Sequence, residues 1–265
     1  MIQYSKYSSC GNDFIVIDNR KNVFCINNVY IQELCNRKTG IGSDGLILLS
    51  SDSMYSYFMS YFNSDGYESS FCGNGSMCCG HFALSLGVFG DTNVGKGVFR
   101  TNEGVFNVSA DLNGVNGFGV ASISMIDVVN FEIIDDDLVM NTGSPHYVRF
   151  VSNLNSLDVE KIGRTIRYGK KFEKEGVNVT FVSYENHQVF IRTYERGVEG
   201  ETLSCGTGAV AAALFMRIKK KILTDHVIIN TSGGQLNVSF TYNESSFINI
   251  TLESAYINRS FDGFL

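Results

Sequence analysis

Short apolar runs separated by polar turns dominate the chain and predict a sheet-rich fold. Runs of four to eight residues that are rich in β-branched and aromatic side chains are typical of strands. The 27 glycines and the single proline indicate that Gly, Asn and Asp form most of the turns. The predicted strands are Phe14–Asp18, Leu46–Leu49, Tyr55–Phe62, Val98–Thr101, Val105–Val108, Val120–Met125, Tyr147–Val151, Val179–Val182 and Val189–Tyr194.

Fewer segments predict helices, and two of these are mainly apolar runs. Helices are expected at Val29–Cys35, Met77–Leu86, Asp158–Arg167 and Ala209–Met216. The second and fourth are expected to pack an apolar face against the core. The acidic stretch from Ile133 to Leu138 predicts an exposed connection. After a hairpin at Gly233-Gly234, the chain is expected to end in short strands.

A cysteine inside a glycine-rich turn precedes each apolar helix. The first turn is Cys72-Gly73-Asn74-Gly75, and the second is Cys205-Gly206-Thr207-Gly208. Each cysteine is therefore predicted at a helix N-terminus, where the backbone N–H groups have no partner within the helix. Such a position lowers the pKa of a thiol and binds carboxylates.

The order of motifs around the two cysteines indicates an internal duplication. Gly11-Asn12-Asp13-Phe14 corresponds to Gly143-Ser144-Pro145-His146, and Asn63 precedes Cys72 as Glu195 precedes Cys205. Two similar α+β lobes, with one helix N-terminus from each at a shared cleft, would explain this order.

Two thiols on opposite faces of one carbon can invert its configuration. A thiolate removes the proton from one face and a thiol returns one on the other. Helix N-termini directed at the substrate carboxylate would stabilise the carbanion, so the scheme needs no pyridoxal lysine and no metal. His146 and Glu195 are placed to tune the thiols. Arg196 can bind a carboxylate, and Asn12, Asn63 and Asn178 lie beside turns.

Composition narrows the class of protein. The formal net charge is −6 and the longest basic run is Lys219-Lys220-Lys221, which argues against a nucleic-acid partner. No signal peptide and no run of membrane-spanning length is visible, so the expected location is the cytoplasm, with no membrane partner. Seven cysteines at irregular spacing indicate reduced thiols. Core packing is the expected role of Cys10, Cys25, Cys35, Cys78 and Cys79, and His81, His187 and His226 are expected to be structural.

The motifs together resemble the diaminopimelate epimerase family. They occur in that family's order and cover roughly residues 10 to 210. The resemblance implies a pyridoxal-independent, two-base epimerase that interconverts LL- and meso-diaminopimelate, and it implies a cytoplasmic homodimer. The motifs are Gly11-Asn12-Asp13-Phe14, Gly40-Ile41-Gly42-Ser43-Asp44-Gly45, Asn63-Ser64-Asp65-Gly66, Cys72-Gly73-Asn74-Gly75, Pro145-His146, Gly176-Val177-Asn178, Glu195-Arg196-Gly197 and Glu201–Gly208.

The fold implied by the resemblance is α+β, with two pseudo-symmetric lobes and the active site in the cleft between them. Each lobe is a curved, mostly antiparallel sheet around a central helix. The expected boundaries are 1–118 with 254–265 for the lobe of Cys72, and 119–253 for the lobe of Cys205.

The resemblance also assigns roles residue by residue. Cys72 and Cys205 resemble the two acid/base cysteines, tuned by His146 and Glu195. The substrate-binding set is Asn12, Gly45, Asn63, Gly73, Asn74, Ser144, Asn178, Glu195, Arg196, Gly206 and Thr207. Three positions depart from the family pattern, in which Asn is usual at Ser144, Arg at Met77 and often Gln at Gly45; these changes bear on the distal end of the substrate.

Two alternatives stay open from the sequence. The same fold and mechanism could serve another amino acid, as the changes at Ser144 and Met77 suggest. Cys72 and Cys205 could instead form a regulated disulfide in a non-enzymatic thiol switch. A metal site built on Cys72, Cys78 and Cys79 is disfavoured, because no Cys-x-x-Cys pair or histidine pattern completes it.

Overall fold

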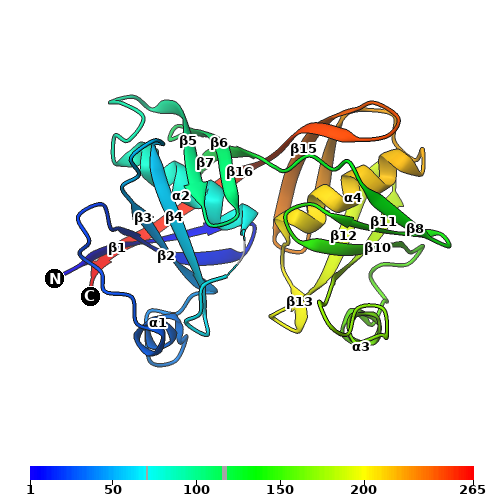
Figure 1. Ribbon diagram of the computed structural model, residues 1–265, viewed down its shortest axis with the longest axis horizontal. Helices are drawn as coiled ribbons and strands as arrows, with labels where there is room; N and C mark the ends of the chain where they lie inside the picture. The colour runs from blue at the N-terminus through cyan, green and yellow to red at the C-terminus, as the bar shows by residue number, and fades with distance from the viewer. Residues whose placement is uncertain (70, 115–117) are drawn as a thin grey trace. The chain divides into compact units, whose positions relative to one another are not determined.

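The computed structural model describes residues 1–69, 71–114 and 118–265, and it divides into two compact units (Figure 1). Unit 1 comprises Met1–Ile123 and Glu253–Leu265, and unit 2 comprises Ser124–Leu252. The expected lobe boundaries, at residues 118 and 253, stay predictions. Among the described residues, no helix has both the length and the apolar character of a membrane span.

In the described part of unit 1, eight strands pair to form a closed ring. The order is β1-β2-β3-β4-β5-β6-β7-β16, and β16 also pairs with β1. Two neighbouring pairs, β2–β3 and β4–β5, are parallel, and the printed pairings of the other neighbours are antiparallel. The elements are β1 (Gln3–Ser9), β2 (Asn12–Asp18), α1 (Asn28–Cys35), β3 (Gly45–Ser50), β4 (Tyr57–Asn63), α2 (Gly73–Ser85), β5 (Val94–Thr101), β6 (Gly104–Asp111), β7 (Gly119–Ser124) and the second part of β16 (Phe247–Phe264).

Helix α2 lies inside this ring, and Figure 1 shows the strands of unit 1 around it. Its residues from Gly73 to Leu84 are all buried, which explains why small and apolar side chains make up most of the segment. Close packing requires Gly80, because a Cβ there would lie 2.3 Å from Val108 Cγ2.

Unit 2 repeats this plan around α4. Its sheet runs β8-β9-β10-β11-β12-β14-β15-β16, and β13 pairs with β12. Helix α4 is buried from Gly206 to Met216. The elements are β8 (Phe131–Ile134), β9 (Asp137–Asn141), β10 (Pro145–Phe150), α3 (Val159–Arg167), β11 (Asn178–Glu185), β12 (Gln188–Glu195), β13 (Gly200–Thr202), α4 (Gly206–Ile218), β14 (His226–Thr231), β15 (Gly234–Tyr242) and the first part of β16.

The sequence of pairings is the same in both units. In unit 1, β1 is antiparallel to β2, β2 parallel to β3, β3 antiparallel to β4, and β4 parallel to β5. In unit 2, β9, β10, β11, β12 and β14 follow the same alternation. Helices α1 and α3 occupy one equivalent connection, and α2 and α4 the other. The duplication read from motif order is thus present in the topology, and the expected fold class is confirmed.

The strand registers show which single residues of the two units are equivalent. Phe14 pairs with Gly45 and His146 pairs with Asn178, each across a parallel pair of strands. Gly45 in turn pairs with Asn63. The β11–β12 ladder begins at Val179–Tyr194, so Asn178 and Glu195 are its next positions. The equivalent pairs are therefore Phe14 and His146, Gly45 and Asn178, Asn63 and Glu195, and Cys72 and Cys205.

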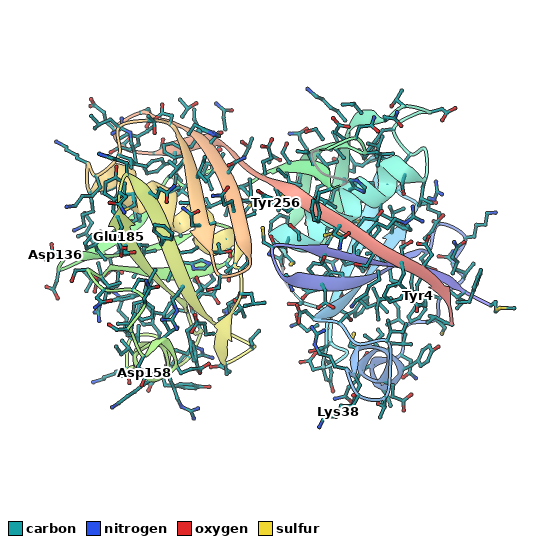
Figure 2. The ribbon with its side chains drawn as sticks, turned by 180° about the vertical axis from the view of Figure 1, so that it is seen from behind. Tyr4, Lys38, Asp136, Asp158, Glu185 and Tyr256 are labelled. Carbon is teal, nitrogen blue, oxygen red and sulfur yellow. The ribbon has the colours of Figure 1, made fainter. Side chains whose placement is uncertain are left out.

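Three parts of the sequence interpretation were wrong or incomplete. Strand β1 was not predicted. The acidic stretch from Ile133 to Leu138 is a β8–β9 hairpin rather than an exposed connection; Asp136 at its turn points outward (Figure 2), but Asp137 is buried and accepts a hydrogen bond from Arg149 Nη2 at 2.7 Å. The chain ends in one strand of 18 residues, β16, instead of several short ones.

Candidate active site

Cys72 is the N-cap residue of α2. Its extended backbone, with φ −118° and ψ 110°, turns the side chain back over the first turn of the helix. The Sγ atom accepts a hydrogen bond from the Gly75 N–H at 3.3 Å. Gly75 fits here because a Cβ would lie 3.1 Å from Ile47 and 3.3 Å from the Cys72 sulfur. The thiol is partly exposed, so it can meet a ligand while the helix stabilises its anion.

Asn12 lies beside Cys72 and is held by charged neighbours. Its Oδ1 is 3.9 Å from Cys72 Sγ, and its Nδ2 donates to Asp44 Oδ2 at 2.7 Å. Arg37 binds both Asp44, at 2.7 Å, and Asp13, at 2.6 Å. Burial raises the pKa of Asp13, but the hydrogen bonds and charges of Arg37 and Lys6 outweigh it and hold that pKa below its usual range. This network keeps the Asn12 carbonyl turned towards the thiol.

Asn63 and Gly45 face each other at the ends of β4 and β3. The backbone of Asn63 closes a turn, since its N–H donates to Tyr67 O at 3.0 Å and its C=O accepts from the Gly66 N–H at 2.9 Å. A hollow in the surface of unit 1 is lined by Cys72, Phe71, Tyr61, Met59 and residues of two adjoining loops. Cys72 thus lines a small hollow together with aromatic side chains of β4 and the segment before α2.

Cys205 is the N-cap residue of α4, with a backbone almost identical to that of Cys72, φ −125° and ψ 112°. It differs in its surroundings. No side-chain capping bond forms to this helix, Cys205 is buried, and its Sγ lies 3.4 Å from Thr207 Oγ1. The second cysteine therefore contacts a hydroxyl group where the first contacts a backbone amide.

A buried chain of hydrogen bonds continues from Thr207 to His146. His146 Nε2 is 2.8 Å from Thr207 Oγ1, and Nδ1 is 2.9 Å from Thr180 Oγ1. Asn178 Nδ2 approaches the same Nε2 at 3.3 Å and also donates to Ser144 Oγ at 2.8 Å. Five side chains of the Cys205 region are thereby linked in one network.

The backbone settles the direction of these hydrogen bonds. The Arg196 N–H can only donate, so the Asn178 atom that accepts from it at 2.8 Å is Oδ1. The Asn178 amide nitrogen then faces His146 Nε2, which must be the unprotonated acceptor. It follows that Nδ1–H donates to Thr180 and that the Thr207 hydroxyl donates to Nε2. The Thr207 oxygen is left to accept from the Cys205 thiol.

Burial keeps His146 uncharged. The side chain is fully enclosed, and this loss of solvation, helped by the Arg196 guanidinium, lowers the pKa of His146 from 6.5 to about 3. A neutral ring agrees with the assignment of Nε2 as an acceptor. His146 thus reaches Cys205 through one hydroxyl group and carries no charge to it.

Glu195 and Arg196 are presented at the end of β12. The Thr202 hydroxyl donates to Glu195 Oε1, while Arg196 Nη1 donates to Glu175 O at 2.7 Å. Both residues are partly exposed. Their carboxylate and guanidinium groups are thus held in place and still reach solvent, as a binding function requires.

The loop after Arg196 is fixed by a second charged contact. Glu199 has a φ of 56° and accepts from the Gly197 N–H at 3.2 Å. Arg167 Nη2 lies 3.2 Å from Glu199 Oε1, and Tyr194 Oη donates to Oε2 at 3.3 Å. Because these contacts bracket the turn, they limit where the Arg196 side chain can point.

Four predicted site residues belong to the first turns of the two buried helices. Gly73 and Asn74 form the first turn of α2, and Gly206 and Thr207 that of α4. Two of the residues that depart from the family pattern have defined surroundings. Ser144 accepts a hydrogen bond from Asn178, and Met77 is fully buried in the core. Among the described residues, no three His, Cys, Asp or Glu side chains are grouped as a metal site requires.

The sequence analysis missed several supporting residues and misplaced one cysteine. Asp44, Arg37, Thr180 and Thr202 hold predicted site residues; Asp44 was visible inside a quoted motif, but its partners are distant in sequence. Cys25, expected in the core, is exposed because it lies in the loop before α1. Cys10, Cys35, Cys78 and Cys79 are buried as expected.

Comparison with known proteins agrees with this arrangement. The model of the family described as diaminopimelate epimerase matches residues 4–109 and 138–256. The chain belongs to the diaminopimelate epimerase family. A diaminopimelate epimerase of Flavobacterium psychrophilum is 43% identical over 94% of this chain and 94% of its own length. One of Methanocella arvoryzae is 38% identical over 90% of each chain.

Solved structures with low sequence identity share the fold of this family member. A phenazine biosynthesis protein of the PhzF family from Bacillus anthracis matches with a TM-score of 0.75 at 15% identity, over 99% of this chain and 98% of its own. A probable proline racemase from Agrobacterium radiobacter matches with a TM-score of 0.75 at 14% identity, over 100% and 93%. The duplicated architecture is therefore found in several proteins with different names.

Proposed function

We propose that this protein is a diaminopimelate epimerase that interconverts the LL and meso isomers, a step of lysine and peptidoglycan precursor synthesis. Family membership and relatives named diaminopimelate epimerase at 43% and 38% identity support the substrate. The observation that carries the mechanism is the doubled N-cap cysteine. Cys72 and Cys205 have the same backbone conformation at the starts of two equivalent, buried helices of 13 residues.

The two sulfur atoms exchange one proton for another at the α-carbon. One cysteine, as thiolate, removes the α-proton, and the electron pair of the broken C–H bond stays on the carbon as a carbanion. The other cysteine, as thiol, donates its proton to the opposite face and becomes the thiolate. Configuration is inverted, no net proton is consumed, and the reverse reaction uses the same groups with their roles exchanged.

The two sulfurs have different hydrogen-bond partners in the free protein. The Cys205 thiol faces the Thr207 hydroxyl, whose oxygen is also 2.8 Å from His146 Nε2. Cys72 accepts from the Gly75 N–H, and its thiol faces the Asn12 carbonyl oxygen. Each sulfur thus has a neighbour that can hold its thiol proton, as a residue that serves as base in one direction and acid in the other requires.

Backbone amides at both helix starts stabilise the developing negative charge. The N–H groups of Gly73 and Asn74, and those of Gly206 and Thr207, belong to first turns that have no intrahelical acceptor. A carboxylate bound there lies next to the carbanion, so the same donors stabilise the enolate character of the transition state. Loss of one such donor in enzymes typically costs about 10²- to 10³-fold in kcat.

Side chains of unit 2 bind the distal amino acid group of diaminopimelate. Arg196 binds the distal carboxylate, and Glu195 the distal ammonium. Ser144 is bonded to Asn178, so its shorter side chain is tied to the same distal set. A homodimer and a cytoplasmic location accompany this function, supported by the family resemblance.

Activity with defined cysteine variants tests the proposal. The wild-type protein under reducing conditions should convert LL-diaminopimelate to the meso isomer, followed by chiral chromatography. Cys72→Ser and Cys205→Ser should each lose turnover by about 10³-fold or more, because a serine hydroxyl is a far weaker acid and base. The matched control is Cys79→Ser, a cysteine buried in α2. Wild-type protein that leaves the LL isomer unchanged would exclude this function.

A further inference from the structure

The two equivalent halves differ at one position of the site. Asn178, on β11, bonds to Ser144 and His146 and accepts from the Arg196 N–H. Its equivalent on β3 is Gly45, since Phe14–Gly45 and His146–Asn178 are the corresponding register pairs. The half that carries Cys72 therefore has no side chain at the position where the other half has a polar amide.

The ring of Tyr61 fills the space above Gly45. A Cβ added to Gly45 would lie 2.6 Å from Tyr61 Cε2 and 3.1 Å from Tyr61 Oη, in addition to 2.4 Å from Phe62 O. These distances are well below van der Waals contact. The absence of a side chain at position 45 is thus what admits the phenol to this place.

Strand geometry directs Tyr61 to the same side as Asn63. Alternate residues of a strand share one face, so Tyr57, Met59, Tyr61 and Asn63 point the same way, and the first two are buried. Tyr61 packs its ring against Phe14 with the centroids 5.9 Å apart, and it lines the same hollow as Cys72. The phenol therefore lies among predicted substrate-binding residues and beside a reactive sulfur.

We propose that Tyr61 is a substrate-binding residue that takes the place of a side chain at position 45, and that its hydroxyl donates a hydrogen bond to a carboxylate oxygen of the bound amino acid. The inference rests on the proposed function. Tyr61 contributes binding and orientation, while the proton transfers remain with Cys72 and Cys205. A phenol suits this task because its ring is held by packing against Phe14 and a phenolic O–H is a hydrogen-bond donor.

The test removes the hydroxyl and keeps the ring. Tyr61→Phe should raise KM for LL-diaminopimelate about tenfold with kcat changed less than about threefold, the effect of one lost hydrogen bond to a charged group. Its melting temperature should match that of the wild type, because the packing against Phe14 is preserved. Tyr61→Leu, which removes the ring as well, should raise KM further. The matched control is Tyr30→Phe, on helix α1 and outside the residues that line this hollow.

Each outcome decides the proposal. An unchanged KM in Tyr61→Phe would overturn it, and so would a variant in which kcat, KM and melting temperature change together, because that pattern belongs to a packing residue. Wild-type protein without epimerase activity would refute the proposed function itself. That result is obtained before any Tyr61 variant is assayed, so the two failures are distinguishable.

Discussion

Replacing His146 tests whether this histidine is an uncharged hydrogen-bond acceptor in the Cys205 network. The side chain is fully buried, and its pKa is lowered to about 3. His81 is also buried, and its pKa is lowered to about 4, chiefly by burial and secondly by Arg259. Between pH 6.5 and these values, the unfolded chain binds protons that the folded chain does not. Stability therefore falls as the pH decreases through this window.

The loss of folding stability at a given pH is set by how far that pH lies below 6.5, the ordinary pKa of histidine. At pH 5 the gap is about 1.5 units for each histidine, and one unit corresponds to about 1.4 kcal/mol. Each buried neutral histidine thus lowers the free energy of unfolding by about 2 kcal/mol between pH 7 and pH 5, and the two together lower it by about 4 kcal/mol. His146→Gln should abolish one of the two contributions and leave the other, while still offering a hydrogen-bonding group to Thr207.

Urea unfolding at pH 7 and pH 5 measures this difference. The free energy of unfolding should fall by about 2 kcal/mol less in His146→Gln than in the wild type, and carboxylate contributions cancel in the comparison. The matched control is the same substitution at an exposed histidine, His226→Gln. Equal losses in wild type and His146→Gln would show that His146 is protonated in the folded protein, and the hydrogen-bond assignment would fail.

Three further predictions concern the groups around the two sulfurs. Iodoacetamide should label Cys72 faster than Cys205, since Cys205 is buried and bonded to Thr207; peptide mass spectrometry showing the reverse order would contradict this. Thr207→Val should lower kcat about tenfold or more while Thr207→Ser retains activity, and an active valine variant would show that the hydroxyl bridge is dispensable. Glu199→Gln should raise KM several-fold by loosening the turn that follows Arg196, with kcat little changed; steady-state kinetics with an unaltered KM would count against the Arg167–Glu199 contact as an anchor.

Local signals made much of this molecule predictable from sequence. A cysteine followed by Gly-polar-Gly and an apolar run specifies an N-cap and a buried helix within a single window of residues, and α2 and α4 were found for that reason. Strand periodicity located β2, β3 and β4 to within a few residues.

What the sequence did not reveal depends on distant partners. In the sequence, Asp137 looks like part of a solvent-exposed acidic run. In the structure it is buried and accepts hydrogen bonds from Arg149 and Tyr147 on the next strand. β1 alternates too weakly to be recognised, and it is defined by its pairing with both β2 and β16. Polar strands of this kind are fixed by tertiary pairing rather than by their own composition.

The candidate site also combines residues marked by local motifs with residues placed by distant partners. The cysteines, His146 and Arg196 are marked by their motifs, whereas Tyr61 carries no motif and gains its place from the missing side chain at Gly45. The strand alternation that relates Tyr61 to Asn63 was a usable signal. The tautomer of His146 needed the Asn178–Arg196 backbone contact, which no single sequence displays.

The isotope content of product and recovered substrate tests the two-cysteine mechanism most directly. Wild-type protein is incubated with LL-diaminopimelate in deuterated water, and the reaction is stopped at low conversion. The two isomers are then separated, and the deuterium content of each is measured by mass spectrometry. Two bases on opposite faces predict meso product that carries one deuterium at the inverted α-carbon, while the recovered LL isomer stays largely protonated, because the proton is removed on one side and solvent-derived deuterium is delivered on the other. Product that retains the original proton would indicate a single base acting on both faces and would contradict the assignment of Cys72 and Cys205 as a pair.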